Sequence, residues 1–237
     1  MIKSTERTGS VSRKTLTEQV YRTLKEEIIM QRTPELKMGA RINEVELAAR
    51  LGCSTTPLRE ALNMLRRDNL IVTNAFHYSE VVSFTNKDIQ DLLDVREELE
   101  ISALQQAMPN ITPEDIRNLR DIQTEYEHVY HNSDFIDTYT INRKFHDYIL
   151  RRANNRILAN LLAGLAEQSA LLRSPSMLET RQNASPVGGY PPVIEHGQIL
   201  KAIEAGDQEA ACEAMRQHIR RVRDDVCAYY NRKNSEE

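Results

Sequence analysis

The chain of 237 residues has no tryptophan, only three cysteines and no long apolar run. The cysteines are odd in number and show no CxxC spacing, which argues against a disulfide framework and against a thiolate metal site. A membrane span needs about 20 apolar residues in a row, and the chain starts without the apolar core of a signal peptide. We therefore expect a cytoplasmic protein that contacts no membrane.

Signatures of common enzymes are absent as well. The sequence contains no HExxH, no GxSxG and no glycine-rich phosphate loop, the patterns that position a zinc-bound water, a nucleophilic serine or a nucleotide. No acidic residue stands in a recognisable motif as a general base. We expect no catalytic residues and no enzymatic activity.

The composition favours two helix-rich domains, with 40% hydrophobic and 28% charged residues. The formal net charge is −4, but it is divided unevenly. Residues 1–83 carry 13 Lys and Arg against 10 Asp and Glu, and the remainder carries 18 against 25. A mildly basic N-terminal part and an acidic remainder indicate an N-terminal nucleic-acid-binding domain that is followed by a domain with a different function.

Residues 42–71 have the pattern of a helix-turn-helix. Asn43 is placed to cap the first short helix, Gly52 to make the turn, and Pro57 to lie in the first turn of the second helix. Spacing of the leucines and alanines buries one face of each helix. The exposed start of the second helix is where a recognition helix meets DNA. The candidate DNA contacts there are Ser54, Thr55, Thr56 and Arg59.

A β-hairpin is expected to follow. Residues 70–73 and 80–84 are short apolar runs on either side of a polar loop, which is typical of a wing. The loop at 74–79 contains His77, a further candidate DNA contact, and no glycine.

The second helix and its surroundings resemble the winged-helix reader of the GntR transcription regulators, above all in the run Thr-Pro-Leu-Arg-Glu-Ala-Leu at residues 56–62. Apolar spacing alone would fit a generic helical hairpin about equally well. The resemblance implies that Arg59 contacts a base or a phosphate. Members of this family often have arginine at the position of Thr55 and glycine in the wing, so we expect their docking mode with an altered sequence preference.

From residue 85 onward the pattern is helical almost throughout, with one long loop at 174–192 that is rich in Pro, Gly, Ser and Asn. The sequence thus predicts a mainly α protein in which a winged helix-turn-helix domain precedes an all-α bundle of about six helices. After the helix that starts at Thr85, further helices are expected near 116–131, 134–152, 155–172, 192–205 and 207–231. The predicted division is a disordered tail at 1–14, the winged helix at 15–84, the bundle at 85–231 and a disordered tail at 232–237.

Polar side chains recur on apolar helical faces of this bundle. Asn142 and His146 are four residues apart and so share one face, while His196 and His218 lie on the apolar faces of two other helices. A single such histidine is usually a hydrogen-bonded core residue. Burying three imidazoles costs free energy unless they share partners, and a metal would satisfy them together. A metal-free polar cavity that holds a ligand directly is the alternative.

This second half resembles the FCD ligand-binding domain of the FadR-type GntR subfamily in the stretches DLLDVREELE, NRKFHDYILRRANNRIL and EHGQILKAIEAGDQEAACEAMRQHI. The resemblance implies a divalent metal held by His146, His196 and His218, with Asn142 at the position where the family has Asp. Three imidazoles suit Zn²⁺ or Ni²⁺. The implied effector is a small organic acid or sugar acid. Arg96 either contacts that effector or forms a salt bridge with a neighbouring glutamate.

The sequence therefore predicts a metabolite-responsive transcription regulator, a repressor acting as a homodimer on a pseudo-palindromic operator in double-stranded DNA. A regulator that binds its effector without metal is the first alternative, and a metal-dependent hydrolase is a weaker one, since zinc held by three histidines can activate water. A purely structural adaptor is the third class.

Overall fold

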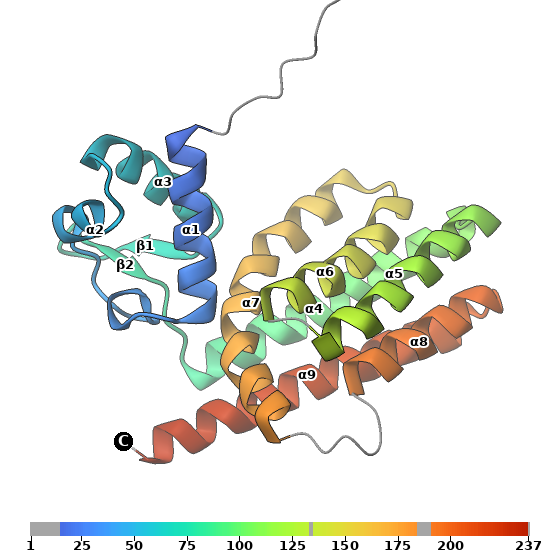
Figure 1. The fold of residues 1–237 in the computed structure, drawn as a ribbon. Coiled ribbons are helices and arrows are strands. Elements are labelled where there is room, and N and C mark those ends of the chain that lie inside the picture. Colours follow the sequence, from blue (N-terminus) through green and yellow to red (C-terminus); the bar gives the residue numbers. More distant parts are fainter. Residues whose placement is uncertain (1–14, 133–134, 184–190, 237) are drawn as a thin grey trace, which may run out of the picture.

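The computed structural model describes residues 15–132, 135–183 and 191–236. Three helices and a two-stranded hairpin form an N-terminal unit, and the remaining helices form a bundle beside it (Figure 1). The N-terminal elements are α1 (Leu16–Met30), α2 (Glu44–Arg50), α3 (Thr55–Arg67), β1 (Ile71–Thr73) and β2 (Ser79–Val81). The bundle contains α4 (Asn86–Ala107), α5 (Pro113–Asn132), α6 (Phe135–Arg152), α7 (Arg156–Asn183), α8 (Pro191–Glu204) and α9 (Gln208–Glu236).

The predicted fold class, a mainly α chain with a winged helix and a helical bundle, is confirmed. Among the described helices, none combines the length and the apolar character that crossing a bilayer requires.

Local capping signals explain where several helices begin. The Thr15 hydroxyl accepts the Glu18 N–H, and the Glu18 carboxylate accepts the Thr15 N–H in return. Thr85 and Asp88 repeat this arrangement at the start of α4. Such reciprocal bonds satisfy N–H groups that a helix leaves free at its start, which is why these starts were readable from sequence.

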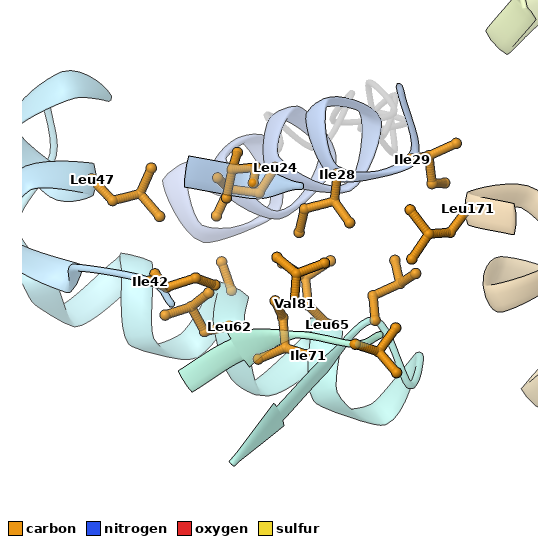
Figure 2. Close-up of a cluster of buried hydrophobic side chains, with 14 of the residues drawn as sticks. Leu24, Ile28, Ile29, Ile42, Leu47, Leu62, Leu65, Ile71, Val81 and Leu171 are labelled. Atoms are coloured by element: carbon orange, nitrogen blue, oxygen red, sulfur yellow. The ribbon is translucent and has the colours of Figure 1, made fainter. Parts of the chain in front are cut away.

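The N-terminal core is a set of fully buried leucines and isoleucines. Leu24 of α1 faces Leu62 and Leu65 of α3, and the β-hairpin closes the cluster from below (Figure 2). Leu171 of α7 reaches the same cluster beside Ile29. The winged helix and the bundle therefore share part of one hydrophobic core.

The course of α7 corrects the sequence prediction. We predicted a loop across 174–192, but α7 continues to Asn183 and α8 already begins at Pro191. Residues 184–190 lie outside the described residues, as do residues 1–14 of the expected N-terminal tail. At the other end α9 reaches Glu236, so the expected disordered tail is helical over 232–236.

Pro175 lies inside α7, where proline lacks the N–H that would bond the carbonyl of Leu171. That carbonyl instead accepts the Ser174 hydroxyl at 3.4 Å and the Gln31 side-chain amide at 3.5 Å. The neighbouring Ser174 hydroxyl donates to the carbonyl of Ile29. The Ser174 hydroxyl and the end of α1 together compensate the interrupted helix, and a loop prediction based on local composition could not include the contacts with α1.

Candidate functional site

The start of α3 is presented to solvent. Ser54 and Thr56 are exposed, Thr55 is half-buried, and the Arg59 side chain is 67% exposed. The Arg59 Nε donates to Oε2 of Glu44, the first residue of α2, at 2.7 Å. An exposed ion pair of this kind contributes at most about 1 kcal/mol, so a phosphate or a guanine edge is able to replace Glu44.

The wing makes its turn without glycine. Oδ1 of Asn74 accepts the N–H groups of Phe76 and Tyr78, both at 3.0 Å. His77 takes up the left-handed conformation, with φ of 61°, which histidine and asparagine tolerate better than most residues. The Arg41 guanidinium stacks over the Tyr78 ring, 3.1 Å from its centre. His77 is exposed at this tip, in a defined rather than a glycine-dependent turn.

The bundle brings the three histidines together. His146 of α6, His196 of α8 and His218 of α9 are all buried, and one ring nitrogen from each lies within 4.8 Å of the others. The ring of His196 is sandwiched between Phe145, at 4.4 Å, and Tyr126, at 4.9 Å. Asn142 is buried one helical turn before His146.

Five polar atoms of this cluster lack hydrogen-bond partners among the described residues. Nε2 of His146, Nε2 of His218, both ring nitrogens of His196 and Oδ1 of Asn142 are buried without a hydrogen bond. Each such orphan costs about 1–3 kcal/mol. Unpartnered nitrogens on three histidines whose ring atoms meet within 4.8 Å match the needs of a metal ion, so the residues present fit the group that the sequence implied.

Two glutamates lie against ring nitrogens of this cluster. Nδ1 of His146 lies 3.3 Å from Glu100, and Nδ1 of His218 lies 2.8 Å from Glu195. A carboxylate on one ring nitrogen directs the other nitrogen inward, as in many metal centres. Burial alone would raise the pKa of Glu100, but the nearby His146 and Arg96 lower it to about 2. Burial, followed by neighbouring positive charges, lowers the pKa values of His196 and His218 well below the usual range, which keeps both rings neutral and able to bind a metal.

Arg96 is buried beside the cluster. Its guanidinium lies 3.2 Å from Glu100, so the salt-bridge alternative from the sequence describes its present partner. It also lines a cavity of about 30 Å³, together with Asn142, His146, Arg143 and others. This volume holds roughly one water molecule.

Both halves of the chain match described protein families. Residues 16–75 match the gntR family of bacterial regulatory proteins, and residues 91–221, more than half of the chain, match the FCD domain. The chain belongs to the GntR family and carries an FCD domain. It is a DNA-binding transcription regulator of this type.

Relatives of this GntR regulator cover nearly its whole length. The HTH-type transcriptional regulator McbR of Escherichia coli is 29% identical over 221 residues, which are 90% of this chain and 95% of McbR. A protein of Paenarthrobacter nicotinovorans, named as the probable D-xylose utilization operon transcriptional repressor, is 28% identical over 88% of both chains. The solved structure of McbR has a TM-score of 0.72 at 24% identity, covering 92% of this chain and all of McbR. A GntR structure from Rhodococcus sp. RHA1 has a TM-score of 0.66 at 21% identity, covering 89% and 96%. These structures support the fold.

An ion-pair chain joins the two domains of this GntR regulator. Arg143 of α6, which lines the small cavity, binds the carboxylate of Glu167 on α7. Oε1 of Glu167 is 2.9 Å from Lys25 of α1, which in turn is 3.1 Å from Asp68 at the end of α3. Glu167 is almost fully buried. This series of ion pairs therefore runs from the cavity to Asp68, the C-cap of the recognition helix, across side chains that no local sequence pattern identifies.

Proposed function

We propose that this GntR regulator is a metabolite-responsive repressor whose FCD domain binds a small carboxylate through a divalent metal. The metal ligands would be Asn142, His146, His196 and His218. The observation that carries the proposal is the set of buried, unpartnered nitrogens in the three histidines. The repressor role is further supported by the name of the Paenarthrobacter relative. A homodimer would place two recognition helices on the half-sites of a pseudo-palindromic operator.

The donor set indicates which metal to expect. Three neutral imidazoles favour Zn²⁺ or Ni²⁺ over Mg²⁺ or Ca²⁺, which prefer oxygen ligands. Asn142 contributes an amide oxygen without charge, so the centre is more positive than one with Asp. When bound, the metal supplies a Lewis-acidic position for a carboxylate oxygen, and Arg96 supplies a cation beside it.

We propose that effector binding changes the affinity for DNA through the ion pairs of Arg143, Glu167 and Lys25. A ligand regulates only if it prefers one arrangement of the protein over another. Because Arg143 lines the cavity and also holds Glu167, a ligand that recruits Arg143 would weaken the attachment of α1 and α3 to the bundle.

The test is metal analysis of protein prepared without a metal-affinity tag, followed by titration with Zn²⁺. We expect close to one metal per chain. If neither the purified protein nor the titrated protein holds metal, the metal-free regulator replaces this proposal, and direct binding of carboxylates to the apo-protein becomes the next measurement.

Asn142→Asp is expected to strengthen zinc binding about tenfold or more, since a carboxylate adds an attractive charge and each tenfold step corresponds to about 1.4 kcal/mol. Competition with a chromophoric chelator measures the change. Asn160→Asp, an exposed position on α7, adds the same charge away from the cluster and should leave zinc affinity unchanged. Equal effects of both variants would show that Asn142 does not face the metal.

Arg59→Ala is expected to weaken operator binding about 10- to 100-fold, because a bidentate arginine contact to guanine is worth roughly 1–3 kcal/mol. Fluorescence anisotropy with operator DNA at fixed salt measures this loss. Arg117→Ala removes an exposed arginine of the bundle and serves as the matched control. Unchanged affinity of Arg59→Ala would remove this residue from the DNA interface.

A further inference from the structure

Phe76, at the tip of the wing, is 77% exposed, more than any other large hydrophobic side chain among the described residues. The other three phenylalanines, Phe84, Phe135 and Phe145, pack into hydrophobic clusters. A single exposed hydrophobic residue is ordinary in itself. Phe76 differs because the loop that carries it is held in a defined turn and is joined to the recognition helix α3.

Hydrogen bonds within the wing fix the backbone around Phe76. Asn74 Oδ1 accepts the N–H groups of Phe76 and Tyr78. The N–H of Asn74 donates to the carbonyl of Tyr78, and the N–H of His77 donates to the carbonyl of Asn74, both at 3.0 Å. These bonds do not involve the aromatic ring. An ordered backbone therefore presents the ring to solvent, and little conformational freedom is lost when a partner buries it.

Two contacts join this loop to the helix-turn-helix. The Arg66 guanidinium, near the end of α3, donates to the Ser79 hydroxyl at 2.5 Å, and Ser79 is the first residue of β2. The carbonyl of Ser79 accepts the N–H of Ile42, in the segment that leads into α2, at 2.9 Å. In a helix-turn-helix protein the recognition helix lies in the major groove. A wing attached to that helix reaches the adjoining minor groove.

The side chains of the wing tip favour contact with bases over contact with phosphates. Residues 75–78 are Ala, Phe, His and Tyr, without an acidic group, and the Glu80 carboxylate of β2 is bound by the Asn74 side-chain amide. The Phe76 side chain has no group that hydrogen-bonds to a phosphate or to a base edge. Proteins that place such apolar side chains in the minor groove insert them between two base pairs, which unstacks the step and bends the duplex.

We propose that Phe76 is a wedge that enters the minor groove of the operator and separates one pair of stacked bases. Pyrimidine–purine steps such as TA and CA open most easily, so Phe76 confers a preference for such a step without any hydrogen bond to it. The inference rests on the DNA binding of the GntR family. It goes beyond the proposed function, since it requires neither a metal nor an effector.

The probe is a DNA duplex that the parent chain selects from a random-sequence pool. Energy transfer between dyes at the two ends of the duplex measures bending. Permanganate oxidises unstacked thymines, and every TA or CA step contains a thymine, so its reactivity locates the opened step. At saturating protein the parent chain is expected to bend the duplex by roughly 20–90° and to make a thymine beside the bound wing reactive. Straight DNA, or the absence of a reactive thymine, overturns the proposal.

Three variants test the wedge at saturating protein. Phe76→Ala is expected to abolish the thymine reactivity, to reduce the bend and to weaken binding about tenfold, because the lost stacking is partly offset by unstacking that is no longer required. Phe76→Leu keeps an apolar wedge and should retain part of both signals. Ile194→Ala removes an exposed hydrophobic side chain from α8 and is the control, with the bend and reactivity of the parent.

Phe76→Ala should melt at the temperature of the parent chain, because the ring is exposed and backbone N–H groups hold the turn. Loss of the two DNA signals is then not a loss of folding. Parental bending and reactivity in the Phe76→Ala complex overturn the proposal whether or not its affinity falls, since a weaker complex with both signals unchanged would place the ring against the wall of the groove.

Discussion

Replacing Glu167 with alanine is expected to lower the free energy of unfolding by about 2–4 kcal/mol, slightly less than the loss of one partner from a fully buried ion pair. The Glu167 side chain is 5% exposed and receives both Lys25 of α1 and Arg143 of α6. Without it, two partly buried cations face each other with no anion between them. Lys25 retains Asp68, so we expect the winged helix to fold but to separate more readily from the bundle.

Urea unfolding of both forms measures the first effect, and operator affinity with and without effector measures the second. The matched control is Glu125→Ala, which removes a glutamate paired with Lys144 at 2.7 Å on the surface. That change should cost less than about 1 kcal/mol and leave the effector response intact. Equal stability losses in the two variants would mean that the Glu167 contacts do not connect the domains.

His196→Leu is expected to change stability in opposite directions with and without metal. Both ring nitrogens of His196 are buried without partners, and each costs about 1–3 kcal/mol in the metal-free protein. Leucine removes that penalty and keeps an apolar side chain between Phe145 and Tyr126. The metal-free variant should therefore be more stable than the metal-free parent. At a zinc concentration of 100 times the dissociation constant the parent gains about 2.7 kcal/mol, and the variant should lose most of this gain.

Thermal unfolding with excess Zn²⁺ and with a chelator measures both signs in one experiment. His128→Leu, at an exposed position of α5, is the control and should keep the zinc-induced shift of the parent. A chelated His196→Leu protein that melts below the chelated parent, yet still responds fully to zinc, would show that His196 is a packing residue.

Signals that are local in sequence predicted most of the fold. The capping pairs Thr15–Glu18 and Thr85–Asp88 place their helix starts correctly because both partners lie three residues apart. Helical periodicity likewise predicted that His146, His196 and His218 face inward, and the structure brings them together.

Contacts between distant segments could not be predicted in this way. Composition at 174–192 indicated a loop, whereas α1 supplies partners that let α7 continue through Pro175. Glu100 contacts His146, and Glu195 contacts His218. Each contact joins two different helices, so the pattern within one helix does not predict it.

The interrupted helix at Pro175 has a consequence for chimeras that combine the winged helix of one regulator with the helical bundle of another. The Leu171 carbonyl, which Pro175 cannot bond, accepts both the Ser174 hydroxyl of α7 and the side-chain amide of Gln31, the residue that ends α1. A winged helix transplanted from another family member would therefore keep these contacts with the bundle only if it had a donor at the position of Gln31 and a cation at the position of Lys25. Chimeras that match only the DNA-contacting residues would have the intended operator preference, but their winged helix would be poorly attached to the bundle. In this protein the winged helix and the bundle are matched to each other by specific contacts, and a recombined chain has to preserve these contacts.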